Sequence, residues 1–368
     1  MNEGKFQPIT TGGDLFKVNF FKYLSKKLRL KVISTTRNYD QEAPRYQQYL
    51  ASIGNSYEIE LLPPYQFYSN LQYLESSIGD TPCVMFNDAI NMNTIGRKLK
   101  QKLNVKIGYE AHNINYHLNT ELQLGAKEIT YEKIIETEAL ILADYIFVRS
   151  QNDKNQLQLL ATAYSDKIHI ARSGIDDQYI KNIYHLQTKS SFNKKIGFIG
   201  HLNYQPNIQA VQYIIDRIAP QVYQYDKEIV FLIAGVGMDK SRFKNIPNVQ
   251  YVGYVPTVEA FLQDVDLAIC PLTEGSGTRL KIVDYLSRGI PTISTSKGIE
   301  GLEDTIEECI ILENNIDAYA NKIKSFYNQD FASIQERSKK SLEFIKRYRA
   351  WSVIINDYYL PLKSLCPY

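Results

Sequence analysis

The segment "VDLAICPLTEGSGTRLKIVDYLSRGIPTISTS", residues 265–296, contains the pattern that decides the fold. An apolar run ends at Leu272, a loop of small and polar residues follows, and a helical stretch over 280–289 leads into a second apolar run at 290–296. Continuous apolar, β-branched runs that alternate with helical stretches are typical of parallel strands buried on both faces of a sheet. The segment therefore predicts a strand, a loop, a helix and a second strand.

The same alternation extends along the whole chain. In its first half the expected strands are 30–36, 57–62, 82–88, 105–111, 144–150 and 167–171. In its second half they are 194–200, 228–235, 249–254, 265–272, 290–296 and 309–313. Two such sets in series predict an α/β protein with two Rossmann-like, doubly wound domains.

The domain bounds follow from composition. We expect an N-terminal domain over 1–183, a polar linker near 184–194, and a second domain over 194–345. After a break near Tyr348, the helix within 346–368 is expected to cross back to the first domain. An α/β domain usually opens with a strand, but the residues ahead of the first helix are not strongly apolar. The first strand is either degenerate or formed by residues upstream of this sequence, and both alternatives remain open.

Composition limits the class of protein. The chain of 368 residues is 44% hydrophobic and 22% charged, as in soluble globular proteins, and its net charge of +2 gives no reason to expect a nucleic-acid partner. No apolar run approaches the ~20 residues of a membrane span, and the N-terminus has no signal-peptide core. We expect a cytoplasmic protein whose cysteines are reduced thiols without metal-ligand spacing. The cysteines are Cys83, Cys270, Cys309 and Cys366.

The loop after Leu272 has the features of an anion site. Ligands of open parallel sheets bind beyond the carboxyl ends of the strands, where the next helix also directs its positive end. Arg279 and Lys281 place cations in a helical turn where the dipole favours acids, so we infer a phosphate or diphosphate ligand. The alternative is a glycine-rich turn followed by two solvated cations. The loop residues that can bring the backbone close to a ligand are Gly275, Ser276, Gly277 and Thr278.

Asp284 lies one helical turn after Lys281 on a similar face. A carboxylate in that position can accept hydrogen bonds from two sugar hydroxyls, as acidic residues do for ribose in dinucleotide sites. The alternative is a solvated acid paired with Lys281 or Arg288.

The stretch "EGSGTRLKIVDYLSRGIPTISTSKGIEGL" (274–302) resembles the nucleotide-sugar site of the retaining glycosyltransferases of family four. These enzymes have the two-domain GT-B fold, and one branch carries a Gly-Ser-Gly-Thr-Arg-Leu-Lys turn. The resemblance extends over nearly the whole chain. Its further segments include "GFIGHLNYQPNIQAVQYI" (197–214), "YEAHNINYH" (109–117) and "YRAWSVIINDYY" (348–359).

The resemblance implies roles for individual residues. Arg279 and Lys281 would stabilise the diphosphate, Asp284 the ribose hydroxyls, and Glu274 the donor sugar. His112 would contact the donor sugar near the reacting carbon. Asp284 departs from the family pattern, in which a Glu is usual. Further contacts to the donor are implied for Gly12, Gly13, Gly235, Gly237, Tyr254 and Val255, for which plain turns are the alternative.

By the same resemblance, the protein is a retaining hexosyltransferase that needs no metal and no cofactor beyond its nucleoside-diphosphate sugar. The sequence leaves open whether the base is uracil or guanine, and whether the acceptor is a carbohydrate, a lipid-linked sugar or a protein. Polysaccharide, glycolipid and glycoprotein assembly all fit. A non-catalytic partner subunit and a UDP-sugar epimerase remain the alternatives.

Two charged stretches are expected to be solvated helix faces. Basic residues in 22–31 and 97–106 would also suit peripheral contact with the inner face of a membrane. Glu132, Glu136 and Glu138 lie on one predicted helix, where a solvated face is favoured over an acceptor site.

Overall fold

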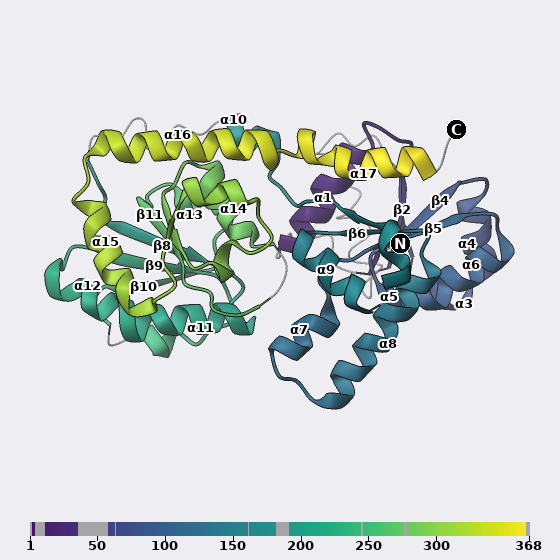
Figure 1. Cartoon of the computed structure of the whole chain (residues 1–368), viewed down its shortest axis with the longest axis horizontal. Helices are drawn as coiled ribbons and strands as arrows, with labels where there is room; N and C mark the ends of the chain where they lie inside the picture. Colours follow the sequence, from purple (N-terminus) through teal and green to yellow (C-terminus); the bar gives the residue numbers. More distant parts are fainter. Residues whose placement is uncertain are drawn as a thin grey trace. The chain divides into compact units, whose positions relative to one another are not determined.

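The computed structural model divides the chain into two compact units, which are described separately (Figure 1). Unit 1 comprises Met1–Ser173 and Trp351–Tyr368, and unit 2 comprises Gly174–Ala350. Unit 2 thus begins before the expected 194, and the final segment of unit 1 begins at Trp351, not at 346. The residues that the structure describes are 2–3, 12–35, 58–62, 64–160, 162–181, 191–243, 246–275 and 278–365.

Unit 2 is built on one sheet of six parallel strands in the order β10-β9-β8-β11-β12-β13. This order is that of a doubly wound sheet, in which β9 and β10 are added on one side of β8 and β11 to β13 on the other. The central strands β11 and β12 are buried on both faces, as their continuous apolar runs predict, whereas the edge strand β10 is partly exposed. The strands are β8 Lys195–Ile199, β9 Val230–Ala234, β10 Val249–Gly253, β11 Leu267–Cys270, β12 Thr292–Ser294 and β13 Ile310–Leu312.

Helices connect these strands. The helix expected over 206–225 is present as three consecutive pieces, of which the middle one, η3 (Ile214–Ile218), is π-helical. The α-helices of unit 2 are α10 Asp177–Lys181, α11 Gln205–Tyr213, α12 Ala219–Tyr225, α13 Val258–Leu262, α14 Leu280–Ser287, α15 Tyr319–Tyr327 and α16 Phe331–Tyr348. The 3₁₀ turns are η4 Lys240–Phe243, η5 Lys297–Ile299, η6 Asp304–Glu308 and η7 Ile316–Ala318.

Unit 1 contains two parallel sheets, one in the order β1-β2-β3 and one in the order β4-β5-β6-β7. The first strand, β1, is only two residues long and pairs with the last two residues of β2. The strands are β1 Asn2–Glu3, β2 Lys31–Thr35, β3 Glu58–Leu62, β4 Cys83–Phe86, β5 Lys106–Glu110, β6 Tyr145–Val148 and β7 Ile168–Ile170.

The helices of unit 1 cover these strands. The α-helices are α1 Gly12–Leu24, α3 Pro64–Ser69, α4 Leu71–Ile78, α5 Ala89–Asn91, α6 Arg97–Lys102, α7 Asn115–Glu121, α8 Ala126–Leu142, α9 Gln151–Leu160 and α17 Trp351–Leu365. Two further helical segments are the π-helix η1 Met92–Gly96 and the 3₁₀ helix η2 Thr162–Lys167.

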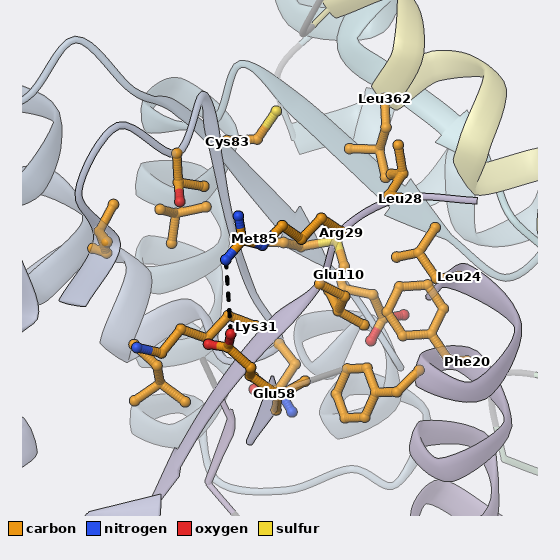
Figure 2. Close-up of a pocket in the computed structure, with 18 of the residues that line it drawn as sticks. Phe20, Leu24, Leu28, Arg29, Lys31, Glu58, Cys83, Met85, Glu110 and Leu362 are labelled. Atoms are coloured by element: carbon orange, nitrogen blue, oxygen red, sulfur yellow. Dashed lines mark ion pairs between the residues drawn. The ribbon is translucent and has the colours of Figure 1, made fainter. Parts of the chain in front are cut away.

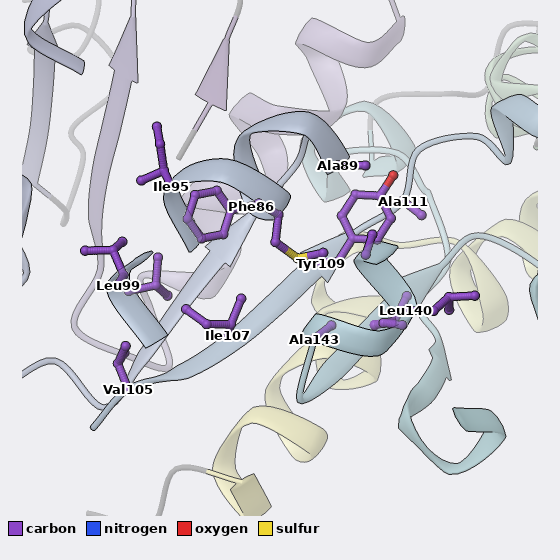
Figure 3. Close-up of a cluster of buried hydrophobic side chains, with 14 of the residues drawn as sticks. Phe86, Ala89, Ile95, Leu99, Val105, Ile107, Tyr109, Ala111, Leu140 and Ala143 are labelled. Carbon is purple, nitrogen blue, oxygen red and sulfur yellow. The ribbon is translucent and has the colours of Figure 1, made fainter. Parts of the chain in front are cut away.

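Two apolar clusters form the core of unit 1. Figure 3 shows the first, in which Phe86, Ile107 and Tyr109 of β4 and β5 pack with Ile95, Leu99 and Leu140 of the helices. The second joins α1 and α17 through buried aromatic rings, among them those of Trp351 and Tyr358. The expected break near Tyr348 is confirmed, because α16 ends there and α17 belongs to unit 1.

The cysteines differ in part from expectation. Cys270 and Cys309 are free thiols, but Cys83 is disulfide-bonded, so the expectation that all four are reduced is wrong for Cys83. Within the part of the chain that the structure describes, none of the helices combines the length and the apolarity needed to span a bilayer.

Candidate functional site

The loop after β11 lies at the switch point of the strand order in unit 2, where β11 pairs with β8 on the side opposite to β9. Ligands of doubly wound sheets bind at this point, beyond the carboxyl ends of the strands. Helix α14 begins directly after the loop with Arg279 as its N-cap residue, and its first turn has no acidic residue. The predicted arrangement of two cations at a helix N-terminus is therefore present.

Lys281 extends from α14 back to β8. Its Nζ donates a hydrogen bond to Oδ1 of Asn207, at 2.6 Å, and lies 4.1 Å from the centre of the Phe198 ring. Burial lowers the pKa of Lys281 to about 8, and the charge of Arg279 acts in the same direction. The fold therefore disfavours the ammonium form at this point, and an anion bound beside it would restore that form.

Arg279 is also buried, with 7% of its side chain exposed, and its Nη2 lies 3.9 Å from Oε2 of Glu300. Lys297 holds the same carboxylate oxygen at 2.7 Å. Glu300 is thus shared by two cations. Glu300 was not predicted as a site residue, although it lies within the segment 274–302.

Two loops meet around these cations. Gly275 has a φ of +102°, and a Cβ there would lie 2.9 Å from Cγ of Pro206 and 3.0 Å from the hydroxyl of Tyr204. A Cβ at Gly200 would lie 3.0 Å from Nζ of Lys281. Both positions need glycine, because the backbone of each loop passes directly beside the groups of the other.

The turn after β9 completes this side of the site. Gly235 and Gly237 have φ values of +136° and +113°, and a Cβ at either would clash with the loop after β8, at the carbonyl oxygen of Gly200 and at Oδ1 of Asn203 respectively. The two glycines therefore allow neighbouring loops to pack. Whether they also contact a nucleotide remains a prediction.

Asp284 is partly buried, with 17% of its side chain exposed, and its Oδ1 accepts a hydrogen bond from Nη1 of Arg288 at 3.3 Å. Burial raises the pKa of the carboxyl group, and Arg288 opposes that effect. Of the two alternatives, the pairing with Arg288 is observed, but the side chain is not the solvated acid expected with it. Binding of ribose hydroxyls by Asp284 stays a prediction.

Glu274 and the neighbouring loop residues are only partly described. Oε1 of Glu274 is buried and, within the described part of the chain, accepts no hydrogen bond. Thr278 donates a hydrogen bond to the carbonyl of Gly301, at 3.4 Å. Ser276 and Gly277 lie outside the described residues.

The remaining predicted contacts lie at chain positions that agree with the prediction without testing it. Tyr254 directly follows β10 and is 63% exposed, and Val255 beside it is half-buried. In unit 1, Gly12 and Gly13 are the first two residues of α1, as expected for a helix entry.

In unit 1, His112 belongs to a buried charged cluster. Its Nε2 lies 3.0 Å from Oε2 of Glu110, and its Nδ1 lies 3.0 Å from Nη2 of Arg149. A guanidinium can only donate, so Nδ1 accepts this hydrogen bond and a neutral ring carries its proton on Nε2. Nε2 lies close to Glu110 but makes no hydrogen bond of regular geometry within the described residues.

Glu110 and Arg149 were not predicted as site residues. Burial acts to raise the pKa of Glu110, but Arg149, followed by His112, lowers it overall. Arg149 also bonds the hydroxyl of Tyr358 and lies 3.6 Å from the centre of the Phe16 ring. A signal was available in the sequence. Glu110 is the last residue of the apolar strand β5, and Arg149 directly follows the neighbouring strand β6.

Glu136 corrects a further expectation. It is not on a solvated face but is 2% exposed, and its carboxylate accepts hydrogen bonds from the backbone N–H groups of Asn115, at 2.6 Å, and Tyr116, at 3.3 Å. It thereby satisfies the N-terminus of α7. Burial raises the pKa of Glu136 to about 7, despite these two hydrogen bonds.

Comparison with known proteins agrees with this architecture. Residues 193–329 match the family described as "Glycosyl transferases group 1". An uncharacterized 44.6 kDa protein in the cps region of Klebsiella pneumoniae is 21% identical over 164 residues, which is 42% of each chain and less than half the length of that relative.

The similar solved structures span nearly the whole chain. HepE of Anabaena, in complex with UDP and glucose, has a TM-score of 0.70 at 12% identity and covers 98% of both chains. The protein has the GT-B fold. Sucrose-phosphate synthase of Thermosynechococcus elongatus gives a TM-score of 0.70 at 13% identity, covering 99% of this chain and 98% of that one. A glycosyltransferase of Rickettsia africae gives 0.69 at 14% identity, covering 99% and 97%. The two Rossmann-like units are thus those of a GT-B architecture.

Proposed function

We propose that this GT-B protein is a retaining glycosyltransferase, which moves a hexosyl group from a nucleoside-diphosphate sugar to an acceptor hydroxyl. The observation that carries the proposal is the pair of cations at the N-terminus of α14, of which Arg279 is buried and Lys281 partly buried. They lie where a doubly wound sheet binds its ligand. An anion with more than one charge fits a site that concentrates two cations and a helix end.

In the proposed reaction the glycosidic bond to the β-phosphate breaks, and negative charge develops on the leaving diphosphate. Lys281 and Arg279 stabilise that charge from fixed positions, since Asn207 holds the ammonium and Glu300 flanks the guanidinium. No metal ion takes part in this proposal, because the side chains supply the positive charge.

The ribose is assigned to Asp284. Arg288 holds its Oδ1, and we assign hydroxyl binding to the other carboxylate oxygen. Glu274, whose Oε1 is buried at the start of the loop, is assigned to the donor sugar.

For the acceptor we propose a carbohydrate or a lipid-linked sugar, used in surface polysaccharide or glycolipid assembly in the cytoplasm, at the inner face of the membrane. Support comes from the relative in a cps region and from a fold neighbour described as a lipopolysaccharide outer core galactosyltransferase. In α6, Lys100 pairs with Asp144 at 2.9 Å and Lys102 pairs with Glu75 at 2.8 Å. In the stretch 22–31, Lys31 pairs with Glu60 at 3.1 Å, so acids accompany the basic residues of both stretches. Any membrane contact is assigned to the remaining lysines of 22–31.

The first test is donor binding. The melting temperature should be measured with UDP, GDP, ADP and their common sugars. We expect the nucleotides of one base to raise it, since a ligand bound only to the folded state stabilises that state. Lys281→Ala should remove that shift and lower sugar transfer by roughly 10²-fold or more. Lys339→Ala, an exposed lysine of α16, is the matched control and should change neither.

The outcomes separate the alternatives. Normal transfer by Lys281→Ala would refute the proposed role of this residue. Conversion of the donor sugar without an acceptor would identify an epimerase. Nucleotide binding without any turnover, across a panel of acceptors, would indicate a non-catalytic partner subunit.

A further inference from the structure

Helix α8 of unit 1 has an apolar side that faces solvent. One side of the helix packs on α7, which lies beside it in Figure 1, and Glu136 holds the first residues of that helix. Another side is buried in the first core cluster through Leu140. The remaining side carries Tyr131, Ile134 and Ile141, each more than half exposed. These three residues, three and seven positions apart, form the outer stripe of α8.

The outer stripe is separate from the cavity of unit 1. That cavity, of about 610 Å³, is lined by residues of α1, β2 and β4, among them Phe20, Lys31 and Met85 (Figure 2). Among the described residues that line it, none belongs to α8. The stripe is therefore a feature of the surface, and apolar side chains that gather on one exposed face mark an interaction site.

The exposed apolar residues of this region are arranged symmetrically about the middle of α8. Tyr131 and Ile134 have the same midpoint in the sequence as Leu124 and Ile141. Leu124 lies just before the helix and is also exposed. In an antiparallel pair of α8 helices with a two-fold axis at this midpoint, Tyr131 meets Ile134 of the second copy. Leu124 then meets Ile141 of the second copy.

Two charged residues share this midpoint. Lys127 and Glu138 are both exposed, and each lies four positions from an apolar residue of the outer stripe, on the same face of the helix. The same two-fold axis places Lys127 of each copy opposite Glu138 of the other. Glu138 lies 3.6 Å from Arg97 within its own chain, but both side chains are about half exposed, so the carboxylate stays accessible. The face is thus complementary to itself in charge as well as in apolar groups.

The charges of α8 argue against a lipid surface as its occupant. The helix contains four glutamates and two lysines. Amphipathic helices that bind membranes carry Lys and Arg beside their apolar face, because the lipid surface is negatively charged. The acidic side chains of α8 would be repelled by such a surface, whereas a second copy supplies a lysine for Glu138.

We propose that the outer stripe of α8 binds a second copy of this chain, in a two-fold symmetric dimer formed by antiparallel α8 helices. The contact is isologous, since each copy contributes the same residues. One helix face buries less than the ~800 Å² per partner of a standard interface, so we expect a dissociation constant in the micromolar range. This inference does not depend on the proposed function.

Charge reversal tests the predicted pairing. Sedimentation equilibrium over roughly 1 to 100 µM covers the range of a weak dimer. Lys127→Glu and Glu138→Lys each place like charges opposite one another at two positions, and each should weaken the dimer by roughly tenfold or more. An equimolar mixture of the two variants should form a heterodimer of nearly wild-type affinity, because both pairs then regain opposite charges. Lys339→Glu, at an exposed position of α16, is the matched control and should leave the affinity unchanged.

A further variant tests the apolar part of the contact. Ile134→Ser should weaken the dimer by roughly 10²-fold. Its melting temperature in dilute solution should stay close to that of the wild type, because Ile134 is exposed in the single chain.

Three results would overturn the proposal. The first is a wild-type protein that remains monomeric at about 100 µM. The second is a dimer that either single charge reversal leaves intact, or that the mixture of the two variants does not restore. The third is binding of the wild type to phosphatidylglycerol vesicles that Ile134→Ser abolishes, since this face would then belong to a lipid surface.

Discussion

Binding of a nucleoside diphosphate should draw a proton onto Lys281. Burial lowers the pKa of this lysine to about 8 in the unliganded protein, whereas a diphosphate beside it favours the ammonium and returns the pKa toward about 10.5. At pH 8.5 only about a quarter of the unliganded protein carries the charge, so binding should take up about 0.7 of a proton. At pH 7 the uptake falls to about 0.1.

The same linkage predicts how affinity changes with pH. The dissociation constant of UDP should rise about 15-fold between pH 8 and pH 9.5, because an increasing fraction of Lys281 must first be protonated. The terminal phosphate is already fully ionised in this window. Burial raises the pKa of the nearby Cys270 thiol, which disfavours its thiolate.

Titration calorimetry measures both quantities. Repeating the titration at pH 8.5 in buffers of different ionisation enthalpy gives the number of protons taken up. Lys281→Arg is the matched control, because arginine stays charged over this range and should bind with no uptake. Proton uptake that is absent in the wild type, or that persists in Lys281→Arg, would show that Lys281 does not contact the phosphate.

Three further predictions concern stability. Gly235→Ala should lower the melting temperature far more than Gly253→Ala. Both glycines have positive φ, but only a Cβ at Gly235 would clash, with the carbonyl of Gly200. Equal melting temperatures of the two variants would contradict this packing argument. Glu136 has a raised pKa, so the free energy of unfolding should fall by at most about 3 kcal/mol as pH rises from 4.5 to 7. Glu136→Gln should remove that slope in urea titrations, and an unchanged slope would assign it to other groups. Glu110→Gln should lower the free energy of unfolding by about 3 kcal/mol, because it leaves the buried guanidinium of Arg149 without its carboxylate. A decrease below about 1 kcal/mol in chemical denaturation would argue that the pair is solvated.

The strands and the anion loop could be predicted because their signals are local. β-branched runs report burial on both faces of a sheet, so the expected strands appear within a few residues of their predicted ends. Arg279 and Lys281 follow from their position relative to the end of β11, which is itself a strand signal. The spacing of Asp284 and Arg288, four residues apart on one helix, likewise allowed their ion pair to be predicted as an alternative to ribose binding.

The missed features depend on contacts between distant parts of the chain. Asn207 holds Lys281 across 74 positions, and nothing in either local pattern specifies that pair. Glu136 lies on a helix with other acids, and its burial arises only when α7 packs on α8. The π-helical η3 interrupts a stretch whose periodicity predicts one uninterrupted helix.

The assignment of α17 to unit 1 has a consequence for biosynthesis. Trp351 and Tyr358 are fully buried among residues of α1, which are synthesised long before them, so the ribosome must deliver α17 before unit 1 can reach its native packing. Unit 2, whose chain is continuous, can mature earlier. Unit 1 begins to emerge before unit 2 and is completed after it, so a stop codon ahead of α17 should harm unit 1 most.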